Sequence, residues 1–158
     1  SAFHDGHLFF GPGDRYEWRV YDLSGHLVRV IRKNVPLPPV TGEMIEAYKA
    51  PRRAADSGSR EGEPRVRPGL DELPFPEHLP AYLRARVDRD GWLWVQDYPI
   101  PGDTVDSWSV FAPSGRWATS LDLPSDWMIA DIGADYILVV LEDELEVERV
   151  ALFSLYRG

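Results

Sequence analysis

The sequence predicts an all-β fold in which about three copies of a four-stranded antiparallel unit follow one another along the chain. Three observations support this prediction: a pattern of loop, strand and turn that recurs in register, short stretches in which apolar and polar residues alternate, and a spacing between the second and third copies equal to the length of one such unit. The 158 residues, with 44% hydrophobic and 12% aromatic content, suffice to bury a substantial core.

The repeat is clearest in two segments that share a Pro-Gly-Asp loop, a strand that begins with tryptophan, and a Ser-Gly turn. The first segment consists of Pro12-Gly13-Asp14, Trp18-Arg19-Val20-Tyr21 and Ser24-Gly25. The second consists of Pro101-Gly102-Asp103, Trp108-Ser109-Val110-Phe111 and Ser114-Gly115. An Asp-Gly pair, typical of a tight hairpin turn, precedes each segment, at Asp5-Gly6 and at Asp90-Gly91.

A third, weaker copy follows the second at a spacing of about 42 to 44 residues. In this copy, Asp135-Tyr136-Ile137-Leu138-Val139 matches the strand after the Asp-Gly pair, and Val150-Ala151-Leu152-Phe153 matches Trp108-Ser109-Val110-Phe111. The spacing is typical of a β-propeller blade, in which four antiparallel strands form a small twisted sheet and neighbouring sheets pack face to face. We therefore predict about three propeller blades.

The spacing between the first and second copies is about double, which indicates either a hidden blade or an insertion. We favour an insertion over residues 36–80, because residues 36–79 hold eight of the 14 prolines and lack the alternation of a strand. Within it, Thr41 can cap a short helix over residues 42–50. Residues 51–69 are rich in Gly, Ser, Pro and charge, and we predict a mobile loop there.

The three predicted blades differ in completeness. Residues 1–35 form a blade without its first strand, residues 81–124 form a complete blade, and residues 125–158 form a last blade without its closing strand. The last strand would leave an unpaired apolar edge, with Val147, Val150, Leu152 and Leu155 as candidate partner-binding residues. Because three blades cannot close a ring, we expect a protein partner, either an absent N-terminal half of a six-bladed propeller or a second copy of the chain.

Four stretches of the chain resemble a known group of proteins, namely residues 18–25, 87–95, 108–115 and 132–136. They are similar to uncharacterised bacterial six-bladed β-propeller proteins and, more distantly, to blades of the NHL-repeat type. The resemblance implies that this chain is the C-terminal portion of such a propeller and that the protein is exported, to the periplasm or the extracellular space. It implies no established activity.

Composition and charge exclude several classes of partner. Seventeen basic against 26 acidic residues give a formal charge of −9, which disfavours binding to nucleic acid or to an anionic lipid surface. The longest apolar run, residues 136–141, is far below the roughly 20 residues of a membrane-spanning helix. There is no cysteine, so disulfides, thiolate metal sites and a cysteine nucleophile are excluded.

Two motifs suggest a metal site, but each is better interpreted as a turn. The segment His4-Asp5-Gly6-His7 holds good ligands for a transition metal, yet its Asp-Gly pair recurs at Asp90-Gly91 without histidines. The segment Asp88-Arg89-Asp90-Gly91 resembles the start of a calcium loop. It lacks a third acidic residue before the glycine, and position 12 of such a loop would be Pro99 instead of glutamate.

The repeat accounts for each of these polar motifs, so we predict a noncatalytic propeller module that acts as a scaffold or a binding subunit, with no catalytic residues and no cofactor. The alternative is half of a calcium-dependent propeller hydrolase, similar to six-bladed lactonases and esterases that hold calcium with Glu, Asp and Asn side chains. The chain has a single asparagine, Asn34, placed away from any predicted channel. The candidate calcium ligands are therefore Asp88, Asp131 and Asp135.

Overall fold

The computed structural model describes residues 1–57, 69, 72–142 and 147–157. The chain divides into two units, one formed by Ser1–Val35 and Pro80–Gly158 and the other by Pro36–Leu79. Of the described residues, no helix combines the length and the apolar character needed to cross a membrane.

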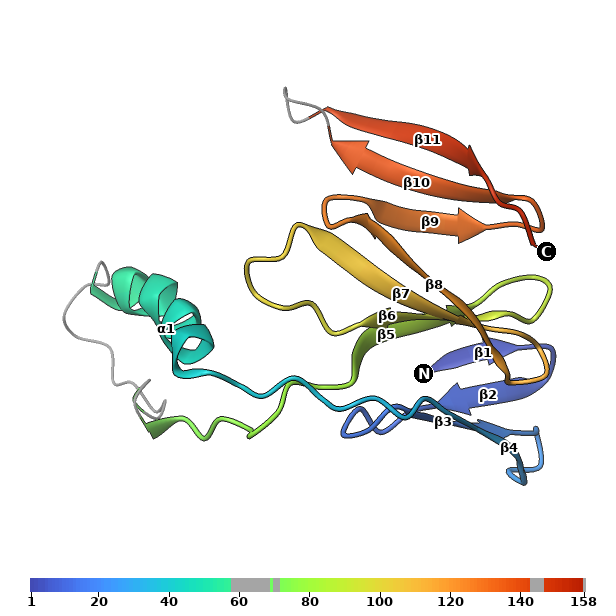
Figure 1. Ribbon diagram of the computed structural model, residues 1–158, viewed down its shortest axis with the longest axis horizontal. Helices are drawn as coiled ribbons and strands as arrows, with labels where there is room; N and C mark the ends of the chain where they lie inside the picture. The colour runs from blue at the N-terminus through green and yellow to red at the C-terminus, as the bar shows by residue number, and fades with distance from the viewer. Residues whose placement is uncertain (58–68, 70–71, 143–146, 158) are drawn as a thin grey trace. The chain divides into compact units, whose positions relative to one another are not determined.

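The first unit holds three antiparallel sheets, which Figure 1 shows in blue, green to orange, and orange to red. The first sheet consists of β1 (Ala2–His4), β2 (His7–Phe10), β3 (Glu17–Tyr21) and β4 (Leu27–Arg32). The second consists of β5 (Tyr82–Val87), β6 (Leu93–Asp97), β7 (Val105–Phe111) and β8 (Trp117–Pro124). The third consists of β9 (Met128–Ile132), β10 (Tyr136–Glu142) and β11 (Glu148–Ser154).

In each sheet, strands that are neighbours in sequence are also neighbours in space. The prediction of a mostly β chain with three antiparallel sheets and one helix is thereby confirmed. The described sheets do not close into a ring.

The first sheet corrects one prediction, because residues 1–35 form four strands and not three. The additional strand, β1, pairs with β2 in the register Ala2↔Phe9, Phe3↔Leu8 and His4↔His7. Asp5 and Gly6 form the turn between them with positive φ angles of 43° and 71°. A strand of three residues is too short to show an alternating pattern, which is why the sequence did not reveal it.

The recurring turns have a common physical cause. Gly25, Gly91 and Gly115 all adopt a positive φ that other residues rarely tolerate. An aspartate at the start of two of these turns binds the backbone that follows: Asp22 Oδ1 accepts from the amides of Ser24 and His26, and Asp88 Oδ1 from those of Asp90 and Trp92. The repeated sequence motif is therefore largely a repeated turn.

Side chains alternate along each strand, so each sheet has two faces, which we call the forward face and, on the opposite side, the back face. The forward face is directed toward the following sheet and carries Trp18 and Val20 in the first sheet, Trp108 and Val110 in the second, and Val150 and Leu152 in the third. The back face carries Leu8, Phe10, Arg19 and Tyr21 in the first sheet, Leu93, Val95, Ser109 and Phe111 in the second, and Ile137, Val139, Ala151 and Phe153 in the third. Strand pairing brings the members of each set together on one side of their sheet.

The second and third sheets pack through a continuous apolar core. Its buried members are Trp94, Trp108, Val110, Ile129, Ile132, Ile137 and Val139. Each large side chain removed from water in this way contributes about 1.5–3 kcal/mol. Trp127, in the connection between these sheets, stacks on Phe153 with ring centroids 4.6 Å apart.

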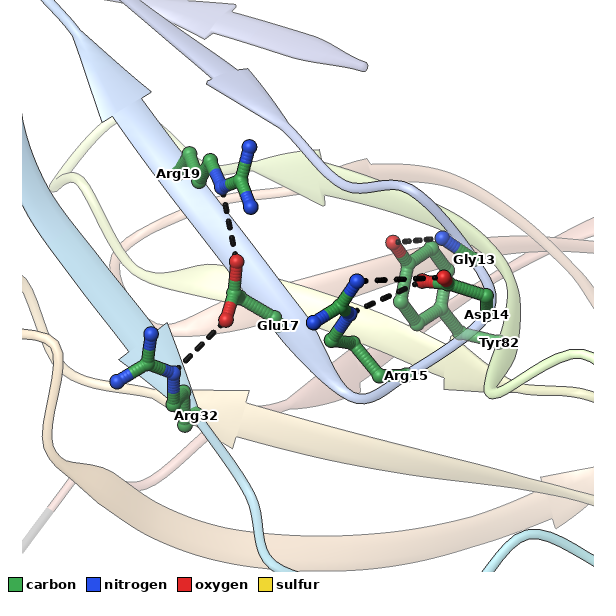
Figure 2. A network of polar contacts seen from close by, with 7 residues as sticks. All are labelled: Gly13, Asp14, Arg15, Glu17, Arg19, Arg32 and Tyr82. Atoms are coloured by element: carbon green, nitrogen blue, oxygen red, sulfur yellow. Dashed lines mark hydrogen bonds and ion pairs between the residues drawn. The ribbon is translucent and has the colours of Figure 1, made fainter.

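The first and second sheets pack mainly through aromatic rings. Trp18 lies 4.5 Å from Tyr82 between ring centroids, and Tyr16 meets Tyr82 edge-on at 5.7 Å. The Tyr82 hydroxyl accepts a hydrogen bond from the Gly13 amide, as Figure 2 shows. A Cβ at Gly11 would lie 1.9 Å from this hydroxyl oxygen, so the loop can approach Tyr82 only because residue 11 is glycine.

The second unit contains the single described helix, α1 (Gly42–Ser57). Thr41 caps it as predicted, with its Oγ1 accepting from the Met44 amide. The predicted end at residue 50 is wrong, because the helix continues through Pro51 to residue 57. Residues 51–57 of the predicted mobile loop are thus helical, and 58–68 lie outside the described residues.

Two arginines beyond Pro51 contact residues of the preceding turns. Arg52 donates to the Tyr48 carbonyl and its guanidinium lies 3.5 Å from the centroid of the Tyr48 ring. Arg53 pairs with Glu46 at 2.7 Å. These contacts accompany the continued helix, in which Pro51 removes one backbone hydrogen bond.

Candidate functional site

Asp88, the first candidate calcium ligand, is buried and its carboxylate is occupied by protein donors. In addition to the two amides bound by Oδ1, Oδ2 accepts from Trp94 Nε1 at 2.8 Å and from Arg157 Nη2 at 2.7 Å. Both oxygens are therefore committed to holding the turn between β5 and β6 and to binding Arg157.

The other two candidates lie in the third sheet. Asp131 accepts a hydrogen bond from the Tyr136 hydroxyl at 2.9 Å and pairs with Arg89 at 3.3 Å. The Tyr136 hydrogen bond is the main reason that the pKa of Asp131 is lowered. Asp135 contributes its backbone carbonyl, which accepts from the Leu155 amide. Within the described part of the chain, no three His, Cys, Asp or Glu side chains are grouped so that they could hold a metal ion.

A polar cluster that the sequence did not reveal joins the first and second sheets. Lys33 Nζ lies 2.8 Å from Ser109 Oγ and 3.7 Å from Asp97, and the Tyr16 hydroxyl donates to Asp97 at 2.7 Å. A serine beside a lysine can act as a nucleophile, but Ser109 is fully buried between the sheets. Burial also raises the pKa of Tyr16 above its ordinary value. This arrangement ties the two sheets together and keeps the Ser109 hydroxyl buried.

A second polar cluster, in which Gln96 and Asp106 are buried, lies between the second and third sheets. Arg84 donates to Gln96, which in turn donates to Asp106. Arg86, also on β5, donates to the carbonyl of Ala130 on β9 at 3.1 Å. Neither cluster has a signal in the sequence, because each residue's partner is on another strand or another sheet.

The forward face of the third sheet is exposed, although the same positions are buried in the other sheets. Val150 and Leu152 have exposed fractions of 67% and 64%. The equivalent residues of the second sheet, Trp108 and Val110, are each 3% exposed because the third sheet covers them. The uncovered positions thus belong to a surface that this chain elsewhere uses for packing.

The back face of the first sheet is exposed in the same way. Leu8 and Phe10 are 42% and 45% exposed, whereas Leu93 and Val95, their equivalents in the second sheet, are 1% and 0% exposed. The equivalence follows from strand pairing, since Phe10 is opposite Arg19 as Val95 is opposite Ser109. Both ends of the stack therefore present an apolar face.

The charged residues named on these two faces give net charges of opposite sign. On the back face of the first sheet, Glu17 pairs with Arg19 and Arg32, each at 2.8 Å, and Figure 2 shows it between them. The hydrogen bond from Arg32, followed by that from Arg19, lowers the pKa of Glu17. On the forward face of the third sheet, Glu142 and Glu148 are directly opposite each other on β10 and β11. Like charges in that arrangement are destabilising.

The predicted edge residues occupy different environments. Val150 and Leu152 lie on β11, and Val147 just before it is also exposed. Leu155 instead packs against the core between the second and third sheets, so it lies apart from the exposed face.

No family model, no curated protein and no solved structure matches this chain.

Proposed function

We propose that the chain is part of a noncatalytic β-propeller and acts as a binding module whose end sheets take a protein partner. The observation that carries this proposal is the exposure of Val150 and Leu152 at positions that are buried in the preceding sheet. An apolar sheet face of this kind usually marks a protein interface.

The order of the sheets supports a propeller. β1 contacts β5, and Arg86 of β5 donates to Ala130 of β9. The first strands of successive sheets are therefore neighbours, as they are around the axis of a propeller. Forward faces also pack on back faces in a constant direction, first to second and second to third.

The polar clusters support a noncatalytic role. The carboxylate of Asp88 is saturated with protein donors, and Ser109, the one described serine found beside a lysine, is inaccessible to a substrate. Each cluster connects strands or sheets, which is a structural use of polar residues.

Site-specific photocrosslinking tests this function. A photoreactive amino acid replaces Leu152 in the full chain within the producing cell, and Ile100 is replaced in a matched control. Ile100 is exposed on the loop between β6 and β7 of the second sheet, whose two faces are already covered. We expect a crosslink to one defined protein from position 152 and none from position 100. Absence of a crosslink from position 152 would contradict the proposed function.

A further inference from the structure

The stack of sheets has a direction, and its two ends are complementary. Every internal contact places a forward face on a back face. Among the described residues, the forward face of the third sheet and the back face of the first sheet are both exposed. A surface at one end thus matches a surface at the other end of the same molecule, which is the condition for head-to-tail association of identical chains.

Resting on the proposed function, we infer that the partner of this face is a second copy of the chain, with the third sheet of each copy packed on the first sheet of the other. Val150 and Leu152 would then be covered by Leu8 and Phe10 of the other copy, as Trp108 and Val110 are covered by the third sheet within one chain. Two copies would hold twice the three described sheets, a number within the roughly four to eight blades of closed propellers.

The repeat also predicts which charges meet across this interface. Tyr16 lies two residues before Trp18, and Glu148 lies two residues before Val150, so Tyr16 and Glu148 occupy equivalent positions of the repeat. The Tyr16 hydroxyl binds Asp97, whose Oδ1 is 3.4 Å from Ser109 Oγ on the back face of the second sheet.

The residue of the first sheet equivalent to Ser109 is Arg19. In the pair of chains, Glu148 of one copy is therefore directed toward Arg19 of the other. Two arginines surround the single carboxylate of Glu17, which leaves an excess positive charge on this face. That excess offsets the repulsion between Glu142 and Glu148.

Sedimentation velocity of the purified full chain from about 1 to 100 μM tests the inference. We expect a dimer that does not grow further. A monomer throughout this range would overturn the inference, and so would polymers that lengthen with concentration, since they would show that the stack does not close. Leu152→Lys should weaken dimerisation by at least about 30-fold, because it places a charge in both interfaces. The matched Ile100→Lys should leave the dimer unchanged.

Two charge-reversal variants, measured separately and mixed, test the head-to-tail arrangement of the two copies. Glu148→Arg and Arg19→Glu should each weaken the dimer, and an equimolar mixture of the two variants should restore it as a heterodimer, because both interfaces then join opposite charges. Circular dichroism confirms that each variant folds. If the faces associated with their own kind, one of the two substitutions would lie outside the interface, that variant would dimerise like the original protein, and the inference would fail.

The crosslinking experiment separates this inference from the proposed function. A crosslink from position 152 to residues of the first sheet of another copy supports both. A crosslink to a different protein supports the proposed function and overturns the second copy as partner.

Discussion

Arg157 Nη2 lies 2.7 Å from Asp88 Oδ2, and this pair joins the segment after β11 to the turn between β5 and β6. The same guanidinium contacts Asp90 at 2.8 Å, the Gly133 carbonyl at 2.8 Å, and the ring of Trp92 at 5.4 Å from its centroid. The side chain of Asp88 is completely buried. Removing Arg157 would therefore leave a buried carboxylate without its charged partner.

We predict that Arg157→Ala lowers the free energy of unfolding by about 2–4 kcal/mol, because breaking a buried pair costs more than breaking an exposed one. Urea unfolding followed by tryptophan fluorescence measures the loss. Arg116→Ala is the matched control, since Arg116 is exposed in a turn of the second sheet and its removal should change stability by less than about 0.5 kcal/mol. Equal losses in the two variants would contradict the role of Arg157.

Val110 and Leu152 occupy equivalent positions of the repeat, but their replacement by alanine should change the free energy of unfolding by different amounts. Val110→Ala should lower the free energy of unfolding by about 2 kcal/mol, because it opens a cavity between the second and third sheets. Leu152→Ala should lower it by less than about 0.5 kcal/mol in the monomer, since Leu152 is exposed. The measurement is urea unfolding at a concentration below dimerisation. A loss at Leu152 as large as that at Val110 would show that its face is already covered within one chain.

Gly11→Ala should destabilise the first unit by about 1–3 kcal/mol through overpacking, because the new Cβ would collide with the Tyr82 hydroxyl. Gly13→Ala serves as a comparison: its Cβ meets no atom within 4 Å, so only the strain of a positive φ of 86° remains, about 1 kcal/mol. Thermal unfolding of both variants distinguishes collision from strain. A smaller loss at residue 11 than at residue 13 would contradict the collision.

Burial raises the pKa of the Asp106 carboxyl above 3.8, so this carboxyl binds a proton more tightly in the folded protein than in the unfolded chain. The resulting stability is fully present below pH 3.8 and is lost as the pH rises through the folded pKa. The Asp106→Asn variant keeps an acceptor for Gln96 but cannot ionise. We therefore predict that it unfolds at a higher urea concentration than the original protein at about pH 7 and shows no such gain at low pH. Urea midpoints across this range provide the test, and a gain that does not vary with pH would refute it.

The sequence predicted the features that repeat and missed those that depend on contacts between distant residues. The Pro-Gly-Asp loops and Ser-Gly turns located the second sheet well, because turn chemistry is local. The short strand β1 and the continuation of α1 past Pro51 were missed, since the first has too few residues to alternate and a proline ordinarily signals the end of a helix.

The candidate site shows the same division. Asp88 attracted a calcium interpretation because its spacing to Asp90 is visible in the sequence. Its actual partner, Arg157, is 69 residues away, and no local pattern connects the two. Val150 and Leu152 were identified because they lie on the last strand, which the repeat predicts to be without a closing partner strand, whereas the Lys33 and Ser109 pair could be seen only once the first two sheets were stacked.

Because each sheet is held mainly by the neighbour on which it packs, the sheets of the first unit should differ in how readily they open locally below the global unfolding transition. The third sheet has three described strands and is covered on one face, so it has the fewest contacts to lose. Its amide protons should exchange with solvent by local opening, while those of β6 and β7, enclosed on both sides, should exchange only when the whole stack unfolds. A gradient of amide protection from the centre of the stack to its ends is the expected signature, and association of two copies would flatten it.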